Sequence, residues 1–245
     1  MFYAEPMIMI AAGAAVFAAA LASSIGGFAF SALVGVALLH LYRDPVPVTA
    51  MVFCCSIAAQ AYGVWALRRQ IEWRSLVPFL IGGLVTVPLG VYLLKITPVS
   101  VFALCLGMVA MSYPLWQMFG RELRLPQDTR HGDGAVGAIA GLVGGLTGAP
   151  SLIMCMWCNL RGWTKERQRA LYQPYILAMQ MLAIACLGAT APSRIPLETL
   201  FFMPVSLVAA YLGFAIFRRL TTPQFNFVFQ GLLIAAGVSL LTHAI

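Results

Sequence analysis

The stretch "ASSIGGFAF", residues 22–30, lies near the middle of an apolar segment that runs from about residue 7 to residue 41. About 20 apolar residues are enough for a helix to cross the hydrocarbon core of a membrane, so this segment is too long for one crossing. Each glycine also weakens a helix interior by about 1 kcal/mol. The sequence therefore predicts two short helices that meet at a non-helical break.

A second apolar segment, residues 134–160, has "GGLTGAPS" (144–151) at its centre. Pro150 lacks a backbone N–H, and a proline costs about 3 kcal/mol in a helix interior. Within a membrane, backbone groups freed in this way are tolerated only against protein or a water-filled cavity. We therefore expect a second break inside the protein.

The composition indicates an all-α integral membrane protein embedded in the lipid bilayer. Of the 245 residues, 61% are hydrophobic and 9% are charged, whereas about a quarter are charged in a soluble domain. Little of the chain remains for a soluble catalytic domain, so we do not expect an enzyme. The net charge of +7 comes from residues in short loops between apolar segments. There they set membrane topology, and we expect no nucleic-acid partner.

The longest polar stretch divides the chain into two halves of similar length. We expect a first transmembrane repeat at 1–118, a cytoplasmic linker at 119–133 and a second repeat at 134–245. An even number of crossings with unpaired surface helices would permit a homodimer. The apolar segments other than the two with breaks are residues 45–67, 75–94, 98–118, 168–189, 197–217 and 224–245.

The loop charges favour a hairpin at 134–160. If all eight segments crossed once, the 15 lysines and arginines would divide almost evenly between the two sides. If 134–160 turned back instead, the poorer side would hold only Arg43, Lys95 and Arg194. Cytoplasmic loops carry an excess of lysine and arginine, so the second arrangement is preferred.

The same order of features occurs in both halves. An offset of 121 residues places Gly27 on Gly148, and each break precedes an aromatic residue, a charged loop and a helix with a glutamine, Gln60 or Gln180. An odd number of crossings in each half would invert the second half. We predict two inverted repeats, each with a broken or re-entrant helical hairpin and three transmembrane helices. In secondary transporters, such breaks form the substrate site.

The breaks are the candidate substrate site. A helix that begins after a break presents free N–H groups and a positive dipole end, which attract anions. Hydroxyl groups would add donors, and glycine would let a ligand approach the backbone. This arrangement suits a small oxyanion or sulfonate. The candidate binding residues are Ser23, Ser24, Gly26, Gly27, Thr147, Gly148, Ser151, Gln60 and Gln180.

No acidic residue lies inside an apolar segment. A buried proton relay of the kind found in many transporters is therefore not expected. A membrane potential, negative inside, drives each negative charge outward by about 2.3 kcal/mol per 100 mV. The sequence is thus compatible with anion export driven by the potential, or by protonation of the substrate itself.

Other interpretations of the same residues stay open. Glycines also let transmembrane helices pack closely without any ligand. Cys155 and Cys158 have the CxxC spacing of a thiol–disulfide oxidoreductase, although buried cysteines more often act as small hydrophobes. No second CxxC or nearby histidine would complete a metal site, and we expect no metal or cofactor. A channel and a non-transporting scaffold also remain. The basic residues at 161–169 are interpreted as a cytoplasmic topology signal, and Trp163 as an interfacial aromatic residue.

Two stretches, "SSIGGFAFSALVGVALLHL" and "LVGGLTGAPSLIMCMWCNLRGWTKERQRA", resemble the repeated pattern of the sulfite exporter TauE/SafE family of membrane permeases. That pattern is a glycine-rich break, an apolar half-helix, a short loop and a basic-polar helix start. The resemblance implies a multi-pass protein of the bacterial plasma membrane that exports or takes up sulfite or small organosulfonates by alternating access. The first break departs from the pattern, since Gly26 and Gly27 are not followed by a proline. A non-sulfur anion therefore stays open as the substrate.

Overall fold

The computed structural model describes residues 6–27, 30–42, 45–94, 132–147, 151–190 and 197–244, together with four single positions between 104 and 111. Within these ranges the regular elements are all α-helices. The expected crossing at 98–118 and the linker at 119–133 lie almost wholly outside the described residues. The helices are α1 (Pro6–Gly26), α2 (Phe30–Tyr42), α3 (Pro45–Leu67), α4 (Trp73–Leu94), α6 (Asp133–Thr147), α7 (Ser151–Leu160), α8 (Lys165–Thr190), α9 (Thr199–Arg219) and α10 (Thr222–Ala244).

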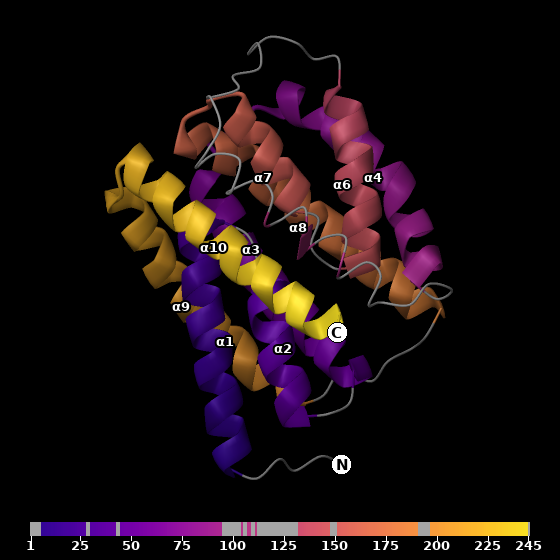
Figure 1. Cartoon of the computed structure of the whole chain (residues 1–245), viewed down its shortest axis with the longest axis vertical. Coiled ribbons are helices and arrows are strands. Elements are labelled where there is room, and N and C mark those ends of the chain that lie inside the picture. Colours follow the sequence, from indigo (N-terminus) through magenta and orange to yellow (C-terminus); the bar gives the residue numbers. More distant parts are fainter. Residues whose placement is uncertain are drawn as a thin grey trace.

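Two helix pairs form the flanks of the molecule, and α8 runs between them (Figure 1). On one flank α4 packs along α6, and on the other α1 packs along α9. Helix α8 contacts α3, α4, α6 and α7, so it joins elements from both halves of the chain. Deeply buried aromatic side chains lie on α4, α8, α9 and α10, where Phe79, Tyr172, Phe217 and Phe225 are at most 2% exposed.

Glycines bring the backbones of α4 and α6 into direct contact. A Cβ atom added to Gly141 on α6 would lie 2.5 Å from the Cα of Gly83 on α4. Added Cβ atoms on Gly137 and Gly145 would fall on the backbone oxygens of Phe79 and Val87. Small residues permit such close approach of helices in membranes. This part of the bundle therefore has no space for any side chain at these positions.

Both long apolar segments are divided in two, as the sequence predicts. The first ends its helix α1 at Gly26 and starts α2 at Phe30, and the second ends α6 at Thr147 and starts α7 at Ser151. The prediction of short helices holds for α6 and α7 but is wrong for α1, which has 21 residues. Its apolar residues continue unbroken from Pro6, so nothing stops the helix earlier. Four of the described helices, α1, α3, α4 and α9, are long and apolar enough to cross a membrane.

Candidate functional site

The first break begins where α1 ends. Gly27 has a φ of +87°, a left-handed conformation that glycine adopts without strain. Its N–H donates to the carbonyl oxygen of Ser23 and so closes the last turn. The ring of Tyr172 lies directly against Gly27, and an added Cβ atom would be 2.8 Å from its Cζ. Both the backbone conformation and the available space therefore require glycine at this position.

Side chains from α8 bind the carbonyl oxygens at the end of α1. The Nη2 atom of Arg169 donates to the oxygen of Ser24 at 2.7 Å, and the Tyr172 hydroxyl donates to the oxygen of Gly26 at 2.8 Å. The last carbonyls of a helix have no partner within the helix. Ser24 and Gly26 are thus paired with residues about 145 positions later in the chain.

This geometry changes what the first group of candidate residues can offer a ligand. The Ser23 hydroxyl donates back to Ala20 within α1, and the described end of the helix presents carbonyl oxygens rather than free N–H groups. An anion near Ser24 and Gly26 would therefore need its donors from elsewhere. Arg169 supplies such donors at this place, whereas the hydroxyl of Tyr172 is already donated to Gly26. That Ser23, Ser24, Gly26 and Gly27 bind a substrate stays a prediction.

Arg169 is completely buried, with 0% of its surface exposed. Its guanidinium carbon lies 4.1 Å from the centre of the Phe217 ring and 4.8 Å from that of Phe214. Cations are attracted to aromatic faces at such distances. Its Nε and Nη1 atoms are buried and have no hydrogen-bond partner within the described parts of the chain.

A stripe of polar residues continues from Arg169 along α8 toward α3. Gln173, one turn further on, packs against Gly63 of α3 and is buried, as are Gln60 and Gln180. The amide of Gln180 donates to the hydroxyl of Ser56 at 2.9 Å. Residues 169, 173 and 180 lie on one face of a helix by their spacing. The structure thus places the two candidate glutamines on helices α3 and α8, which pack against each other.

The second broken segment is closed at its outer ends by a buried ion pair. Asp133, the first residue of α6, accepts hydrogen bonds from Arg161 at 2.7 Å and from the indole N–H of Trp157 at 3.1 Å. The side chains of Asp133 and Arg161 are only 4% and 3% exposed. Arg161 directly follows α7, so the start of α6 and the end of α7 lie together.

The break itself is only partly described. Thr147 closes α6 and Ser151 opens α7, but the side chains of both residues, and all of Gly148, lie outside the described residues. Their predicted role in binding is therefore untouched by the structure. Cys155, one turn into α7, is close enough to Arg169 for an electrostatic interaction. The start of α7 and the end of α1 thus both approach Arg169.

Helix α8 also binds the second broken segment. The hydroxyl of Tyr175 donates to the carbonyl oxygen of Gly137 on α6 at 2.6 Å. Tyr175 lies less than one turn from Tyr172, whose hydroxyl binds the end of α1. One turn of α8 therefore makes hydrogen bonds to both broken segments.

The basic residues before and in the first turns of α8, which the sequence indicates as a cytoplasmic topology signal, are mostly buried inside the protein. Arg161, Lys165 and Arg169 are 3%, 6% and 0% exposed, and only Arg167 lies at the surface. Lys165 donates to the carbonyl oxygens of Phe217 and Leu220 at 2.9 and 2.6 Å, so it caps the end of α9. Trp163 is buried as well, between Arg161 and Arg167, and is not an interfacial aromatic residue.

A spacing of four residues could have revealed these positions in the sequence. Lys165, Arg169 and Gln173 recur every four residues, which places them on one helix face, whereas Arg167 lies on the opposite face. That signal requires the helix to begin at Lys165. The hydropathy of the segment instead places its start near residue 168. Lys165 and Arg169 then lie before or at the predicted start of the helix, and both are counted as loop charges.

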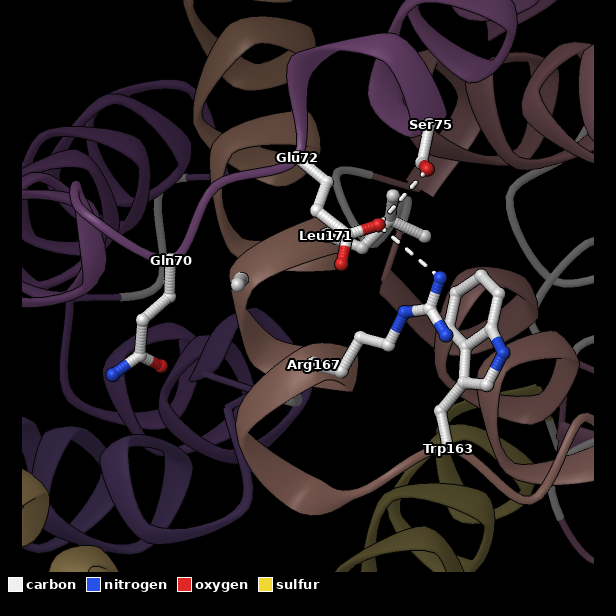
Figure 2. A pocket seen from close by; sticks show the side chains of 7 residues that line it. Gln70, Glu72, Ser75, Trp163, Arg167 and Leu171 are labelled. Carbon is white, nitrogen blue, oxygen red and sulfur yellow. Dashed lines mark hydrogen bonds and ion pairs between the residues drawn. The ribbon is translucent and has the colours of Figure 1, made fainter.

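A small, shallow pocket opens between the α3–α4 loop and the start of α8. Figure 2 shows Glu72 between Ser75 and Arg167, with Gln70 directed away from them. Glu72 accepts from the Ser75 hydroxyl at 3.1 Å and from Arg167 at 3.2 Å. The carboxylate would repel an anion, so this pocket does not fit the predicted anion site.

The two cysteines of the CxxC spacing do not form an accessible redox site. Cys155 and Cys158 are free thiols, and both are 0% exposed. Reactive cysteines lie in electropositive and partly exposed surroundings. Among the described residues, no three histidine, cysteine, aspartate or glutamate side chains come together as a metal site.

Residues 11–240 match the sequence model of the family described as sulfite exporter TauE/SafE, which covers almost the whole chain. No match is found among curated proteins or among solved structures.

Proposed function

The chain belongs to the sulfite exporter TauE/SafE family, and from that premise we propose that it is a secondary transporter of small sulfur-containing anions such as sulfite or organosulfonates. It is a multi-pass membrane protein, and we place it in the bacterial plasma membrane. Its substrate site lies at the two helix breaks, and it works by alternating access around them. It is a transporter rather than an enzyme.

The observation that carries this proposal is the ion pair between Asp133 and Arg161. It holds the start of α6 and the end of α7 together, so the break lies at the far end of a hairpin. At 1.5 Å per residue, α6 and α7 are about 22 and 15 Å long, shorter than the hydrocarbon core of about 30 Å. These lengths support a re-entrant hairpin whose break lies at membrane depth, as the loop charges predict.

The inverted repeat requires that both broken segments turn back. Each half would then have three crossings, and this odd number gives the second half the opposite orientation to the first. Transporters built in this way bind their substrate between the repeats, at broken helices. Helix α8, which binds both α1 and α6, supports a shared site between the two broken segments.

Transport by the purified protein in liposomes tests the proposal. We expect efflux of radiolabelled sulfite that saturates with concentration, is stimulated by sulfite on the opposite side, and accelerates when the vesicle interior is made negative. Thiosulfate, sulfoacetate, taurine and acetate serve as competitors that define the substrate class. Empty liposomes are the control.

Two results would contradict the proposal. Flux that neither saturates nor responds to exchange would indicate a channel. An absence of flux for all these anions, in protein that still elutes as a single folded species, would indicate a scaffold. Flux that follows a pH gradient and ignores the potential would replace only the proposed driving force.

A further inference from the structure

Arg169 has more hydrogen-bonding capacity than the described protein uses. A guanidinium group carries five N–H donors in a fixed plane. One of them binds the oxygen of Ser24, while Nε and Nη1 have no partner although both are buried. An unpaired buried donor destabilises the folded protein, and does so more strongly when it is charged. Capping α1 therefore uses only some of the hydrogen-bond donors of Arg169.

Its charge is also without a carboxylate in the described structure. The ion pairs described there join Arg161 to Asp133, Lys165 to Glu166 and Arg167 to Glu72, and none includes Arg169. Taking a cation out of water costs several kcal/mol unless it is paired. The faces of Phe214 and Phe217 offset part of this cost, at distances of 4.8 and 4.1 Å.

Lys165, one turn earlier on α8, provides the contrast. It is buried too, but its ammonium group binds two carbonyl oxygens of α9 and lies 3.3 Å from Glu166. Both cations cap the end of another helix. Of these two cations, only Arg169 has donors without a partner, and it lies at the end of α1.

The geometry of the guanidinium also limits what could bind. Ser24 uses a single hydrogen of Nη2, so one two-donor edge of the plane stays available whichever hydrogen that is. Such an edge matches two oxygens of one oxyanion, in the bidentate manner of arginine–carboxylate and arginine–phosphate pairs. A lysine at the same place would supply charge without this fork.

We infer that the Arg169 guanidinium is the fixed positive charge that binds the transported anion, through two N–H donors to two oxygens of a sulfite or sulfonate group. This inference rests on the proposed function and names its central binding residue. Because the guanidinium also holds Ser24, it links the occupied site to the position of α1.

The test compares anion binding by the purified full-length wild type and by three variants, Arg169→Lys, Arg169→Gln and Lys165→Gln. Dissociation constants for sulfite, methanesulfonate and chloride come from titrations of the melting temperature and from calorimetry of the folded protein. Loss of one hydrogen bond to a charged group weakens binding by about tenfold or more. We expect about this loss for Arg169→Lys and no detectable sulfite binding for Arg169→Gln.

Lys165→Gln is the matched control, since Lys165 is also a buried cation of α8 that caps the end of another helix, α9. It should melt at a lower temperature yet bind sulfite as the wild type does. Arg169→Lys keeps a charge that can still reach Ser24, so it remains informative if Arg169→Gln does not fold. The preference of Arg169→Lys for sulfite over chloride should fall. The two donors of a guanidinium edge match two oxygens of one anion, whereas chloride is a single spherical ion.

The outcomes separate the inference from the function. If the wild type binds sulfite and the Arg169 variants bind it equally well, Arg169 is not the binding residue, while the proposed transport function is unaffected. If Arg169→Lys lost affinity for sulfite and for chloride equally, bidentate binding of two oxygens by the guanidinium would also be wrong. If the wild type binds none of the anions and transports none, the proposed function itself fails.

Discussion

The break between α1 and α2 is held by side chains that reach it from α8, whereas α6, in the second broken segment, also packs its glycine backbone directly against α4. At the first break, Arg169 and Tyr172 bind carbonyl oxygens of α1. Along α6, glycines place the helix directly on the backbone of α4. The same sequence feature, a glycine-rich interruption of an apolar segment, is thus stabilised in two different ways.

The difference indicates which segment can move. A hydrogen bond contributes only about 0.5–1.5 kcal/mol net, so side chains can exchange partners at small cost. Closely packed interiors tolerate little change in volume or position. We therefore expect α4 and α6 to move as one body during transport, while the end of α1 changes its contacts with α8.

The largest effect is expected at Gly141. Replacement by alanine puts a methyl group 2.5 Å from the Cα of Gly83, and neither backbone can yield without separating the helices. Overpacking costs about 1–3 kcal/mol or more, and leucine should prevent folding. The melting temperature in detergent and the yield of monodisperse protein measure this. Gly231→Ala is the control, because an added Cβ there meets nothing within 4 Å. If both variants melted alike, the backbone contact between α4 and α6 would be refuted.

A smaller effect is expected for Gly27→Ala at the first break. A residue with a Cβ atom costs about 1–2 kcal/mol in the left-handed conformation, and the methyl group would also meet the Tyr172 ring. A double-mutant cycle with Tyr172→Ala separates the two causes, since contacting residues are not additive. The cost of Gly27→Ala should fall to its backbone part when the ring is absent. Strict additivity would show that the ring does not restrict this position.

The smallest change in stability, and the sharpest contrast, comes from two tyrosines of α8. Tyr172→Phe and Tyr175→Phe each remove one hydrogen bond to a carbonyl oxygen, a net contribution of about 0.5–1.5 kcal/mol. Melting temperatures should therefore fall by similar amounts. Only Tyr172→Phe should alter the rate of sulfite transport in liposomes, because only it acts at the segment that we expect to move. Equal effects on transport would remove the distinction between the two segments.

Much of the fold can be predicted from the sequence because its signals are local. Glycine and proline mark the breaks, and α3 occupies the predicted range of residues 45–67. The loop charges led to the hairpin at 134–160, which the contact of Asp133 with Arg161 supports. What the sequence does not indicate is the length of α1, because nothing within an all-apolar run marks where a helix begins.

The candidate site is less predictable, because it depends on contacts between distant parts of the chain. The sequence indicates Ser24 and Gly26 only as neighbours of a break, but their partners lie on α8. The sequence pattern indicates Arg169 only as a topology signal, since charge counting assigns a residue to a side of the membrane and not to a helix face. The four-residue spacing places Arg169 and Arg167 on opposite faces once the helix is known to begin at Lys165, and the tertiary packing shows that Arg169 is the one turned inward.

The long sequence separation of these contacts has a consequence for how the protein is made. Ser24 receives its hydrogen bond from a residue 145 positions later. At a synthesis rate of about 5–20 residues per second, Arg169 follows Ser24 by roughly 7–30 s. Helix α1 therefore enters the membrane with its last carbonyl oxygens unpaired, and its end is completed only when the translocating ribosome has delivered α8. If synthesis stopped before α8 emerged from the ribosome, the unpaired carbonyl oxygens at the end of α1 would be exposed to the insertion machinery.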